Sequence, residues 1–307
     1  MRDRLTWSPS ELLAENFGQL RFYLEPISAP GSTLILFGPR EAGKTQLLFT
    51  MIRAMHEEAL LLGRFPAKRA KVALVEVDMT VVTTQERLKH AAQEYTFSDS
   101  LFRIATPTSL DILRIPAATP WIRDLQAFQP DIVAFDSLRK VHKEDENNPS
   151  VPSAIYGRCR ELFPQSAFWF AHHVKKPPAT WLADKHSYAQ GEDLNAFRGT
   201  SAWLDDADAA IYLYKDTITD KRSFQLVRAR YAEDDVKKEI IGLKMSPDSM
   251  FLEPAELSER QWALHWHLQH PKEVVGKIVD ALEVEYPGRS PSVYYKWAHY
   301  AIKRETP

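Results

Sequence analysis

The stretch that decides the fold is Gly38-Pro39-Arg40-Glu41-Ala42-Gly43-Lys44-Thr45, which satisfies the phosphate-binding pattern G-x-x-x-x-G-K-[ST]. An apolar, β-type run over residues 33–37 leads into it, and residues 46–55 leave it with the apolar spacing of a helix. In a strand–loop–helix unit, the loop N–H groups surround phosphate oxygens at the positive end of the helix dipole. The sequence therefore predicts a nucleotide site made by these eight residues and the next one, Gln46.

Two side chains of this loop have the chemistry that bound ATP requires. Lys44 is expected to reach the β- and γ-phosphates, and the Thr45 hydroxyl is expected to ligate Mg²⁺. The alternative is a glycine-rich turn in some other α/β fold.

A second acidic element ends the apolar run of residues 132–135 at Asp136. A Mg²⁺–phosphate site needs a carboxylate at the carboxyl end of a strand beside the phosphate loop, where it orients the water ligands of the metal. Asp136 is therefore predicted to complete the metal site with Thr45. The alternative is that Asp136 caps the helix that follows.

Hydrolysis also needs a carboxylate that positions the attacking water, and the β-type run of residues 71–77 offers Glu76 and Asp78. Residues i and i+2 of a strand face the same side, so both are expected to point toward the tip of the sheet. Asp78 lies nearer the end and Glu76 has the longer side chain, so either could serve. For each, the alternative is that it caps the next helix.

Another apolar run, residues 167–171, is followed by His172 and His173. A histidine at the end of a buried strand can hydrogen-bond the γ-phosphate or its water and report the nucleotide state to the next loop. Because adjacent strand residues face opposite sides, only one can face the site, and His173 is the favoured one. The chain has no C-x-x-C or H-E-x-x-H motif that would indicate a metal centre.

The order of elements predicts an α/β fold with a mostly parallel sheet and helices on both faces. Further parallel strands are expected at residues 71–77, 101–105, 132–135, 167–171 and 209–214, and an antiparallel set is expected at 223–230, 239–245 and 249–253. We predict an ATPase domain over residues 1–254 and a small helical domain over residues 255–307.

The predicted C-terminal domain has three helices, at residues 257–269, at 272–286 and from Ser290 onward. A turn at residues 287–289 gives a helix-turn-helix or winged-helix shape. The third helix would place polar and basic residues on one face: Arg289, Ser292, Lys296, His299 and Lys303. A DNA-reading module and a protein-contact module both fit this pattern.

Composition indicates the class of protein and its expected location in the cell. The 307 residues are 44% hydrophobic, which suits a globular chain, and the single cysteine, Cys159, cannot form an internal disulfide. Neither a signal peptide nor a membrane-spanning apolar run is legible, so a cytoplasmic protein without membrane contact is expected. The formal net charge of −2 means that any nucleic-acid binding must come from local basic patches.

These motifs together resemble the RecA-like ATPase superfamily and, within it, the RepA-type hexameric replicative helicases of plasmids and phages. The similarity covers about residues 8–253. Besides the phosphate loop, it is carried by residues 10–14, 31–34 and 145–147, by the His172-His173 pair and by the run Arg198-Gly199-Thr200-Ser201-Ala202. The resemblance implies a ring-shaped homo-oligomer, such as a hexamer, that hydrolyses ATP with Mg²⁺ and acts on DNA.

In that group, basic residues on the last core strands reach the nucleotide of the neighbouring subunit. Arg228 and Arg230 match the K/R-x-R pattern, so the resemblance makes them the candidate trans-acting cations. The alternative is that the two arginines form a solvent-exposed stripe on an edge strand and have no role at a nucleotide. Where the group usually has Glu, the resemblance aligns Asp78. Either the shorter carboxylate works, Glu76 substitutes, or hydrolysis is slow.

Single-stranded DNA is expected to contact the loops at residues 139–150 and 175–198, which contain basic and aromatic residues. These are Arg139, Lys140, Lys143, Lys175, Lys176, Trp181, Lys185, Tyr188 and Arg198. The acidic run from Glu144 to Glu146 opposes that binding. Two other functions stay open: a RecA-like regulatory or recombination-mediator ATPase that switches partners without unwinding, and a transferase or small-molecule kinase.

Overall fold

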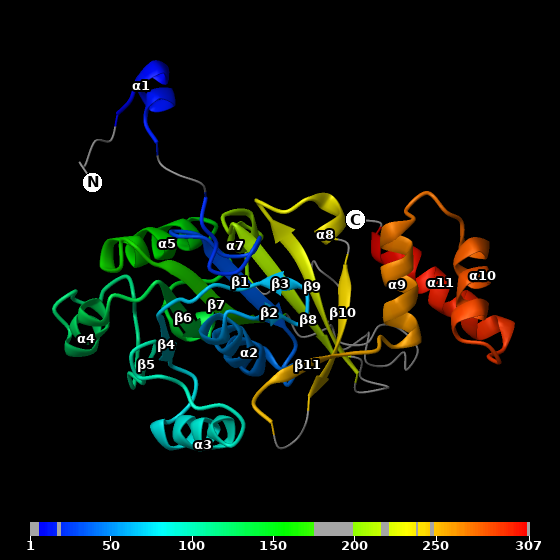
Figure 1. Cartoon of the computed structure of the whole chain (residues 1–307), viewed down its shortest axis with the longest axis horizontal. Coiled ribbons are helices and arrows are strands. Elements are labelled where there is room, and N and C mark those ends of the chain that lie inside the picture. The colour runs from blue at the N-terminus through cyan, green and yellow to red at the C-terminus, as the bar shows by residue number, and fades with distance from the viewer. Residues whose placement is uncertain are drawn as a thin grey trace.

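A twisted sheet forms the centre of the computed structural model, which describes residues 6–16, 20–174, 199–215, 221–237, 239–245 and 249–305 (Figure 1). Within them the main sheet has nine strands in the order β11-β10-β9-β8-β1-β7-β6-β4-β5. The strands from β8 to β5 in this order all run parallel, and β9, β10 and β11 are antiparallel additions at the other edge. The predicted α/β class with a mostly parallel sheet is confirmed.

The strands follow the predicted order closely. Their bounds are β1 (Thr33–Gly38), β4 (Val72–Glu76), β5 (Phe102–Ala105), β6 (Ile132–Asp136), β7 (Ala167–His173), β8 (Ala209–Lys215), β9 (Arg222–Ala229), β10 (Ile240–Met245) and β11 (Leu252–Ala255). A short hairpin of β2 (Leu60–Leu61) and β3 (Phe65–Pro66) forms a separate two-stranded sheet, and Phe65 packs against Phe224 of β9.

The last strand differs from the prediction, because β11 spans Leu252–Ala255 rather than residues 249–253. The prediction ended the strand before Pro254, since proline has no N–H to donate. Proline is tolerated here because β11 is the edge strand and Pro254 pairs with Leu243 of β10 only. The strand thus runs one residue past residue 254, where we predict the domain boundary. That boundary stays a prediction.

Both faces of the parallel sheet are buried, so the central strands read as continuous apolar runs. Leu34 and Leu36 of β1 pack on one face with α2 (Lys44–Glu57), whereas Ile35 and Phe37 pack on the other face with α4 (Pro120–Phe128) and α5 (Ser150–Leu162). On the first face α3 (Val81–Ala92) contributes Ala91. The remaining short elements are α1 (Pro9–Ala14), η1 (Leu138–Lys140), α7 (Ala202–Asp205) and α8 (Asp234–Lys237).

Three C-terminal helices share a second hydrophobic core, to which Ile240 of β10 also contributes. They are α9 (Glu259–Gln269), α10 (Val275–Glu285) and α11 (Pro291–Glu305), and their core includes Ala263, Leu264, Ile278, Leu282 and Ala298. The predicted three helices are therefore present. No strand occurs within residues 256–305, all of which the structure describes, so this segment has no wing.

Most of the polar and basic face predicted for α11 is exposed to solvent. Ser292, Lys296 and His299 are exposed, and Arg289 forms an ion pair with Glu259 at 2.6 Å, while the side chain of Lys303 lies outside the described part. None of the described helices combines the length and the apolar character that crossing a bilayer requires.

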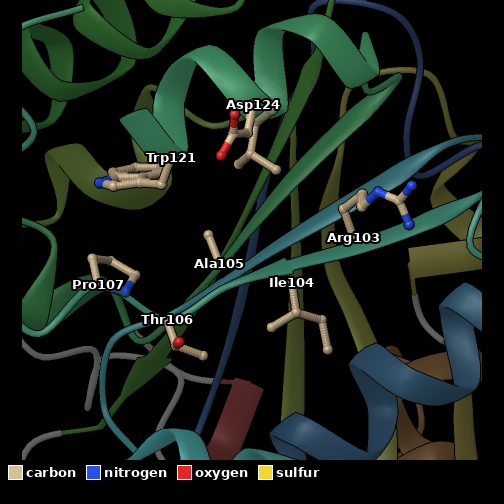
Figure 2. A pocket seen from close by; sticks show the side chains of 8 residues that line it. Arg103, Ile104, Ala105, Thr106, Pro107, Trp121 and Asp124 are labelled. Carbon is tan, nitrogen blue, oxygen red and sulfur yellow. The ribbon is translucent and has the colours of Figure 1, made fainter. Parts of the chain in front are cut away.

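A cavity of about 540 Å³ lies along the outer edge of β5, between that strand and α4 (Figure 2). Trp121 and Asp124 project into it from α4, and residues 103–107 line the strand side. Three strands separate β5 from β1, so this cavity is distant from the phosphate loop. No residue of the predicted nucleotide site lines it.

Candidate nucleotide-binding site

The phosphate loop joins the carboxyl end of β1 to the first turn of α2, as predicted. Two glycines allow this path. A side chain at Gly38 would overlap the Leu213 carbonyl of the neighbouring strand, and Gly43, the residue before α2, has a φ of +100° that favours glycine. The loop backbone thus approaches β8 closely and turns directly into the helix, whose first N–H groups remain available to an anion.

Lys44 folds back over the loop. Its Nζ donates to the carbonyls of Gly38 at 3.0 Å and Pro39 at 2.7 Å. Burial lowers the pKa of Lys44 to about 8, against the attraction of the Asp136 carboxylate. An ammonium held in this way lies among the loop residues, where a β- or γ-phosphate would be bound.

Thr45 and Asp136 meet as the metal prediction requires. The Thr45 hydroxyl donates to Asp136 Oδ2 at 2.6 Å, and Asp136 is the last residue of β6. Burial raises the pKa of the Asp136 carboxyl, while the Thr45 hydrogen bond and the charges of Arg87 and Lys44 oppose that rise. Asp136 does not cap a helix, because η1 begins after Ser137 and has no side-chain cap.

The donor set fits Mg²⁺ shared with a nucleotide. Among the described residues, no group of three or more His, Cys, Asp or Glu side chains could hold a metal alone. One hydroxyl and one carboxylate suit Mg²⁺, which retains waters and takes its other ligands from phosphate oxygens. Thr45 and Asp136 would hold the ion in that way.

Glu76 lies beside Asp136, since the last residues of β4 and β6 are paired in register. Its side chain is nearly inaccessible, with the residue 1% exposed. Oε1 accepts from the N–H groups of Asp78 at 3.0 Å and Met79 at 3.1 Å, and Oε2 faces Arg87 Nη1 at 3.3 Å. Burial, and then the negative charge of Asp136, raises the pKa of Glu76 to about 7, and these three donors oppose the rise.

Asp78 is placed differently from the prediction. β4 ends at Glu76, so the strand alternation that would point both carboxylates the same way does not extend to Asp78, which is exposed in the turn before α3. Its negative charge still raises the pKa of Lys44 and of Asp136. Neither carboxylate caps α3, because Thr80 does so by accepting from the Thr83 N–H at 3.2 Å.

Arg87 is a functional candidate that the sequence reasoning missed. It reaches Glu76 from the second turn of α3 and is the only side-chain cation paired with that carboxylate among the described contacts. A lone arginine on a helix gives no local signal, because most such residues face solvent. Only the packing of α3 against the end of β4 brings the two side chains together.

His173 ends β7, the strand that lies between β1 and β6. In the register of the sheet it is opposite Gly38, and Ala171 is opposite Asp136. His172 is buried, whereas His173 is half-buried. The structure therefore brings His173 to the edge of the sheet that carries the phosphate loop and Asp136, and its contact with a γ-phosphate remains a prediction.

Two further cations flank the loop on the side of β8. Lys215 Nζ lies 3.4 Å from the Glu41 carboxylate, and Arg222 Nη2 donates to the Glu41 carbonyl at 3.4 Å. Lys215 and Arg222 are a cross-strand pair of β8 and β9. A cavity of about 480 Å³ adjoins them, lined by Lys221, Arg222, Leu243, Lys244, Met245, Ala255 and Glu256. No local pattern in the sequence indicates these contacts, which join segments far apart in the chain.

Arg228 and Arg230 lie at the opposite end of the sheet from the phosphate loop. Arg228 donates to the carbonyls of Ala207 at 2.9 Å and Asp205 at 2.8 Å, and Arg230 pairs with Asp208 at 3.1 Å. Asp208 in turn accepts from the N–H of Thr33, the first residue of β1. Because β1 has six residues, which span roughly 20 Å, neither arginine can reach the nucleotide site of its own chain.

The loop after β6 carries three exposed basic residues, Arg139, Lys140 and Lys143. Arg139 is 3.4 Å from Glu146, whose carbonyl accepts from the N–H of Thr200 at 3.0 Å. A side chain at Gly199 would lie 2.6 Å from that carbonyl, which explains the glycine there. The second predicted DNA loop, residues 175–198, lies outside the described residues.

A family model described as an AAA domain (AAA_25) matches residues 3–179, more than half of the chain. The chain belongs to this AAA domain family. A solved structure titled as an ATPase domain is similar, with a TM-score of 0.50 and 12% identity over 73% of this chain and 85% of that chain. A KaiC-like protein, PH0186 of Pyrococcus horikoshii OT3, has a TM-score of 0.49 and 13% identity over 76% of this chain and 94% of its own. No curated protein matches the chain.

The family model, the solved structure with a TM-score of 0.50 and the sheet topology confirm a RecA-like P-loop ATPase, as the motifs indicated. In this AAA domain protein the phosphate loop follows β1, the carboxylate predicted for the metal site ends β6 and a buried glutamate ends β4, all at the carboxyl ends of the parallel strands.

We expect Glu76→Gln to lower ATP turnover by roughly 10²- to 10⁴-fold while ATP binding is retained, because the amide keeps an acceptor oxygen but cannot take a proton from water. Asp78→Asn should lower turnover only a few-fold, because Asp78 is exposed, unlike the buried Glu76 and Asp136. Steady-state hydrolysis and equilibrium binding of a fluorescent ATP analogue distinguish the two. A larger loss in Asp78→Asn than in Glu76→Gln would show that Asp78 positions the water.

The raised pKa of Glu76, about 7 against an ordinary 4.5, makes stability depend on pH. The folded chain holds a proton that the unfolded chain releases, so the free energy of unfolding falls as pH rises from about 4.5 to about 7. Glu76→Gln removes this titration. Its melting temperature should exceed that of the wild type at pH 8 by more than it does at pH 5.

Glu86→Gln, on the surface of α3, is the matched control. Its hydrogen bond with Lys89 lowers the pKa of Glu86, so this substitution should not stabilise the protein at pH 8. Equal melting shifts for the two variants at both pH values would contradict the account of Glu76.

Proposed function

We propose that this ATPase is a ring-forming motor that uses ATP and Mg²⁺ to move on DNA as a replicative-type helicase, acting in the cytoplasm as a homo-oligomer such as a hexamer. The observation that carries the proposal is the separation of the charges between two ends of one sheet. The phosphate loop, Asp136 and Glu76 lie at one end, and Arg228 and Arg230 at the other. A nucleotide could therefore meet these arginines only from an adjacent copy of the chain.

Each residue of the site has a chemical task in this proposal. Lys44 binds the β- and γ-phosphates, Thr45 and Asp136 hold the metal, and Glu76 orients the attacking water and takes its proton. Bound Mg²⁺ would neutralise charge on the phosphate oxygens. His173 would contact the γ-phosphate or the water, and Arg230 or Arg228 of the next copy would stabilise charge that develops on the transferred phosphoryl group.

DNA contact is proposed at the loop after β6, which leads directly from the metal-site residue Asp136. Its exposed Arg139, Lys140 and Lys143 could bind phosphates of a single strand. Arg139 and Lys140 belong to η1, which begins two residues after Asp136, so a change at the nucleotide would reach them through a short stretch of chain.

One observation favours a regulatory ATPase that does not unwind DNA. The acidic residues of the same loop pair with basic residues of the chain: Arg139 lies 3.4 Å from Glu146, and Arg114 lies 2.5 Å from Glu144. These contacts reduce the positive charge available to DNA. A nucleotide-gated switch between partners would not require a continuous basic track.

Lys44→Ala is expected to abolish ATP hydrolysis and leave the fold intact, because Lys44 Nζ bonds only two loop carbonyls among its described hydrogen bonds. In the wild type, single-stranded DNA should raise the hydrolysis rate several-fold, and a forked duplex should be separated. The assays are phosphate release with and without DNA, strand separation, and circular dichroism for folding. A DNA-independent rate without strand separation would favour the regulatory ATPase, and normal hydrolysis by folded Lys44→Ala would refute the nucleotide site.

Arg230→Ala should abolish hydrolysis without weakening ATP binding, because the guanidinium acts on the nucleotide of another copy. Mixing inactive Arg230→Ala with inactive Lys44→Ala should restore part of the activity, since a mixed pair joins one intact loop to one intact arginine. The mixture is compared with each variant alone at the same total concentration. Constant specific activity of the wild type on dilution to monomers, followed by light scattering, would rule out this role in trans.

A further inference from the structure

Three large apolar side chains are exposed directly after the carboxylates of the site. Met79, Val81 and Val82, which we name the α3 patch, are 40%, 63% and 63% exposed. A residue that precedes a helix cap often packs on the fourth helical residue, but here that residue is the buried Thr84 and Met79 remains exposed. Three such residues within four positions form an apolar surface that the described part of the chain leaves exposed, which is typical of a contact site.

The α3 patch is connected to Glu76 by short covalent and hydrogen-bonded paths. The N–H of Met79 donates to Glu76 Oε1 at 3.1 Å, and Arg87, two turns along the same helix, reaches Glu76 Oε2 at 3.3 Å. A partner that presses on the patch therefore acts on the segment that supplies two of the three donors to this carboxylate. Small movements of α3 would change how Glu76 is held.

The other end of the same molecule presents a complementary surface. Tyr231, 42% exposed, directly follows Arg230, whose side chain is 57% exposed, and Tyr231 packs edge-on against Phe22. Next to the α3 patch, the exposed carboxylate of Asp78 would match such a cation. Residues 78–82 include no basic residue, which makes nucleic acid a poor occupant.

The two surfaces lie at opposite ends of the sheet. Figure 1 shows α3 at one end and α7 and α8, which flank the end of β9 that carries Arg228, at the other. A contact between unlike ends of identical chains repeats from copy to copy and builds a ring or a filament.

We propose that the α3 patch is the docking surface for a second copy of this chain, which contacts it with Tyr231 and Arg230, and that docking fixes Glu76 in its working position. This rests on the proposed motor function and adds to it. The neighbour then contributes an arginine and also orders the residue that positions the water. The site is complete only in the assembly.

The test removes apolar area from the patch without touching the site. Val81→Ser/Val82→Ser should fold normally, because both side chains are exposed in the first turn of α3, where serine is well tolerated. We expect assembly to need roughly 10- to 100-fold more protein than the wild type, measured by light scattering in the presence of an ATP analogue. Hydrolysis should fall in parallel and recover at the concentrations that restore assembly.

Val274→Ser/Val284→Ser is the matched control, because it removes the same atoms from two exposed positions, one at the residue before α10 and one within α10. It should assemble and hydrolyse ATP as the wild type does. If the α3 variant also assembles at the wild-type concentration, or if the wild type is monomeric throughout, the proposal is wrong. If the α3 variant assembles like the wild type, the proposed function still holds provided that DNA stimulates wild-type hydrolysis and that Lys44→Ala has lost hydrolysis.

Cross-linking identifies the contact itself. Cys159 is fully buried and should not react, so the two introduced cysteines of Val82→Cys/Tyr231→Cys supply the accessible thiols. A short bis-maleimide should join copies into a ladder of oligomers, and Val284→Cys/Tyr231→Cys should give none. The absence of a ladder in Val82→Cys/Tyr231→Cys, under conditions where it assembles, would overturn the assigned contact.

Discussion

The hydrogen bond from Thr45 to Asp136, at 2.6 Å, is the interaction on which the site depends. It joins the first turn of α2 to the end of β6, although β7 lies between β1 and β6 in the sheet. Parallel strands bring their carboxyl ends to one edge, so the loop after β1 and the last residues of β4, β6 and β7 meet there without further adjustment. Side chains from distant parts of the sequence thereby form one site.

Burial of charge is the cost of this arrangement. Lys44, Glu76 and Asp136 are all removed from water, which lowers the pKa of the lysine and raises that of both carboxyls. Each is held by specific partners: loop carbonyls for Lys44, backbone N–H groups and Arg87 for Glu76, and the Thr45 hydroxyl for Asp136. A glutamate with a pKa near 7 is suited to take and release a proton at neutral pH, so the destabilising burial would also serve the chemistry proposed for Glu76.

Local patterns were sufficient to predict the parts of the site that one segment determines. The phosphate loop, Asp136 and Glu76 each follow an apolar strand, and the strand itself fixes where its last residue lies. Asp78 was misplaced because the sequence does not say at which residue β4 stops. Arg87, Lys215 and Arg222 could not be predicted, since their contacts depend on how α3 and the β8–β9 pair pack on the sheet. The end of β11 was predicted too early because a proline is tolerated within a strand only at the sheet edge, and the sequence does not show that β11 is an edge strand.

The polarity of the sheet places Arg228 and Arg230 at the end opposite the phosphate loop of their own chain. Asp208 accepts from the first N–H of β1 and pairs with Arg230, so the arginine is fixed to the end of the strand whose other end carries the phosphate loop. In the proposed assembly, a rigid sheet would set a constant distance between the nucleotide of one copy and the arginine that this copy presents to the next. In an assembly built on this repeat, a shift of one copy would change both the arginine and, through α3, the glutamate at the nucleotide of the copy on which it docks. Hydrolysis and subunit contact would therefore be coupled by the same element that defines the fold.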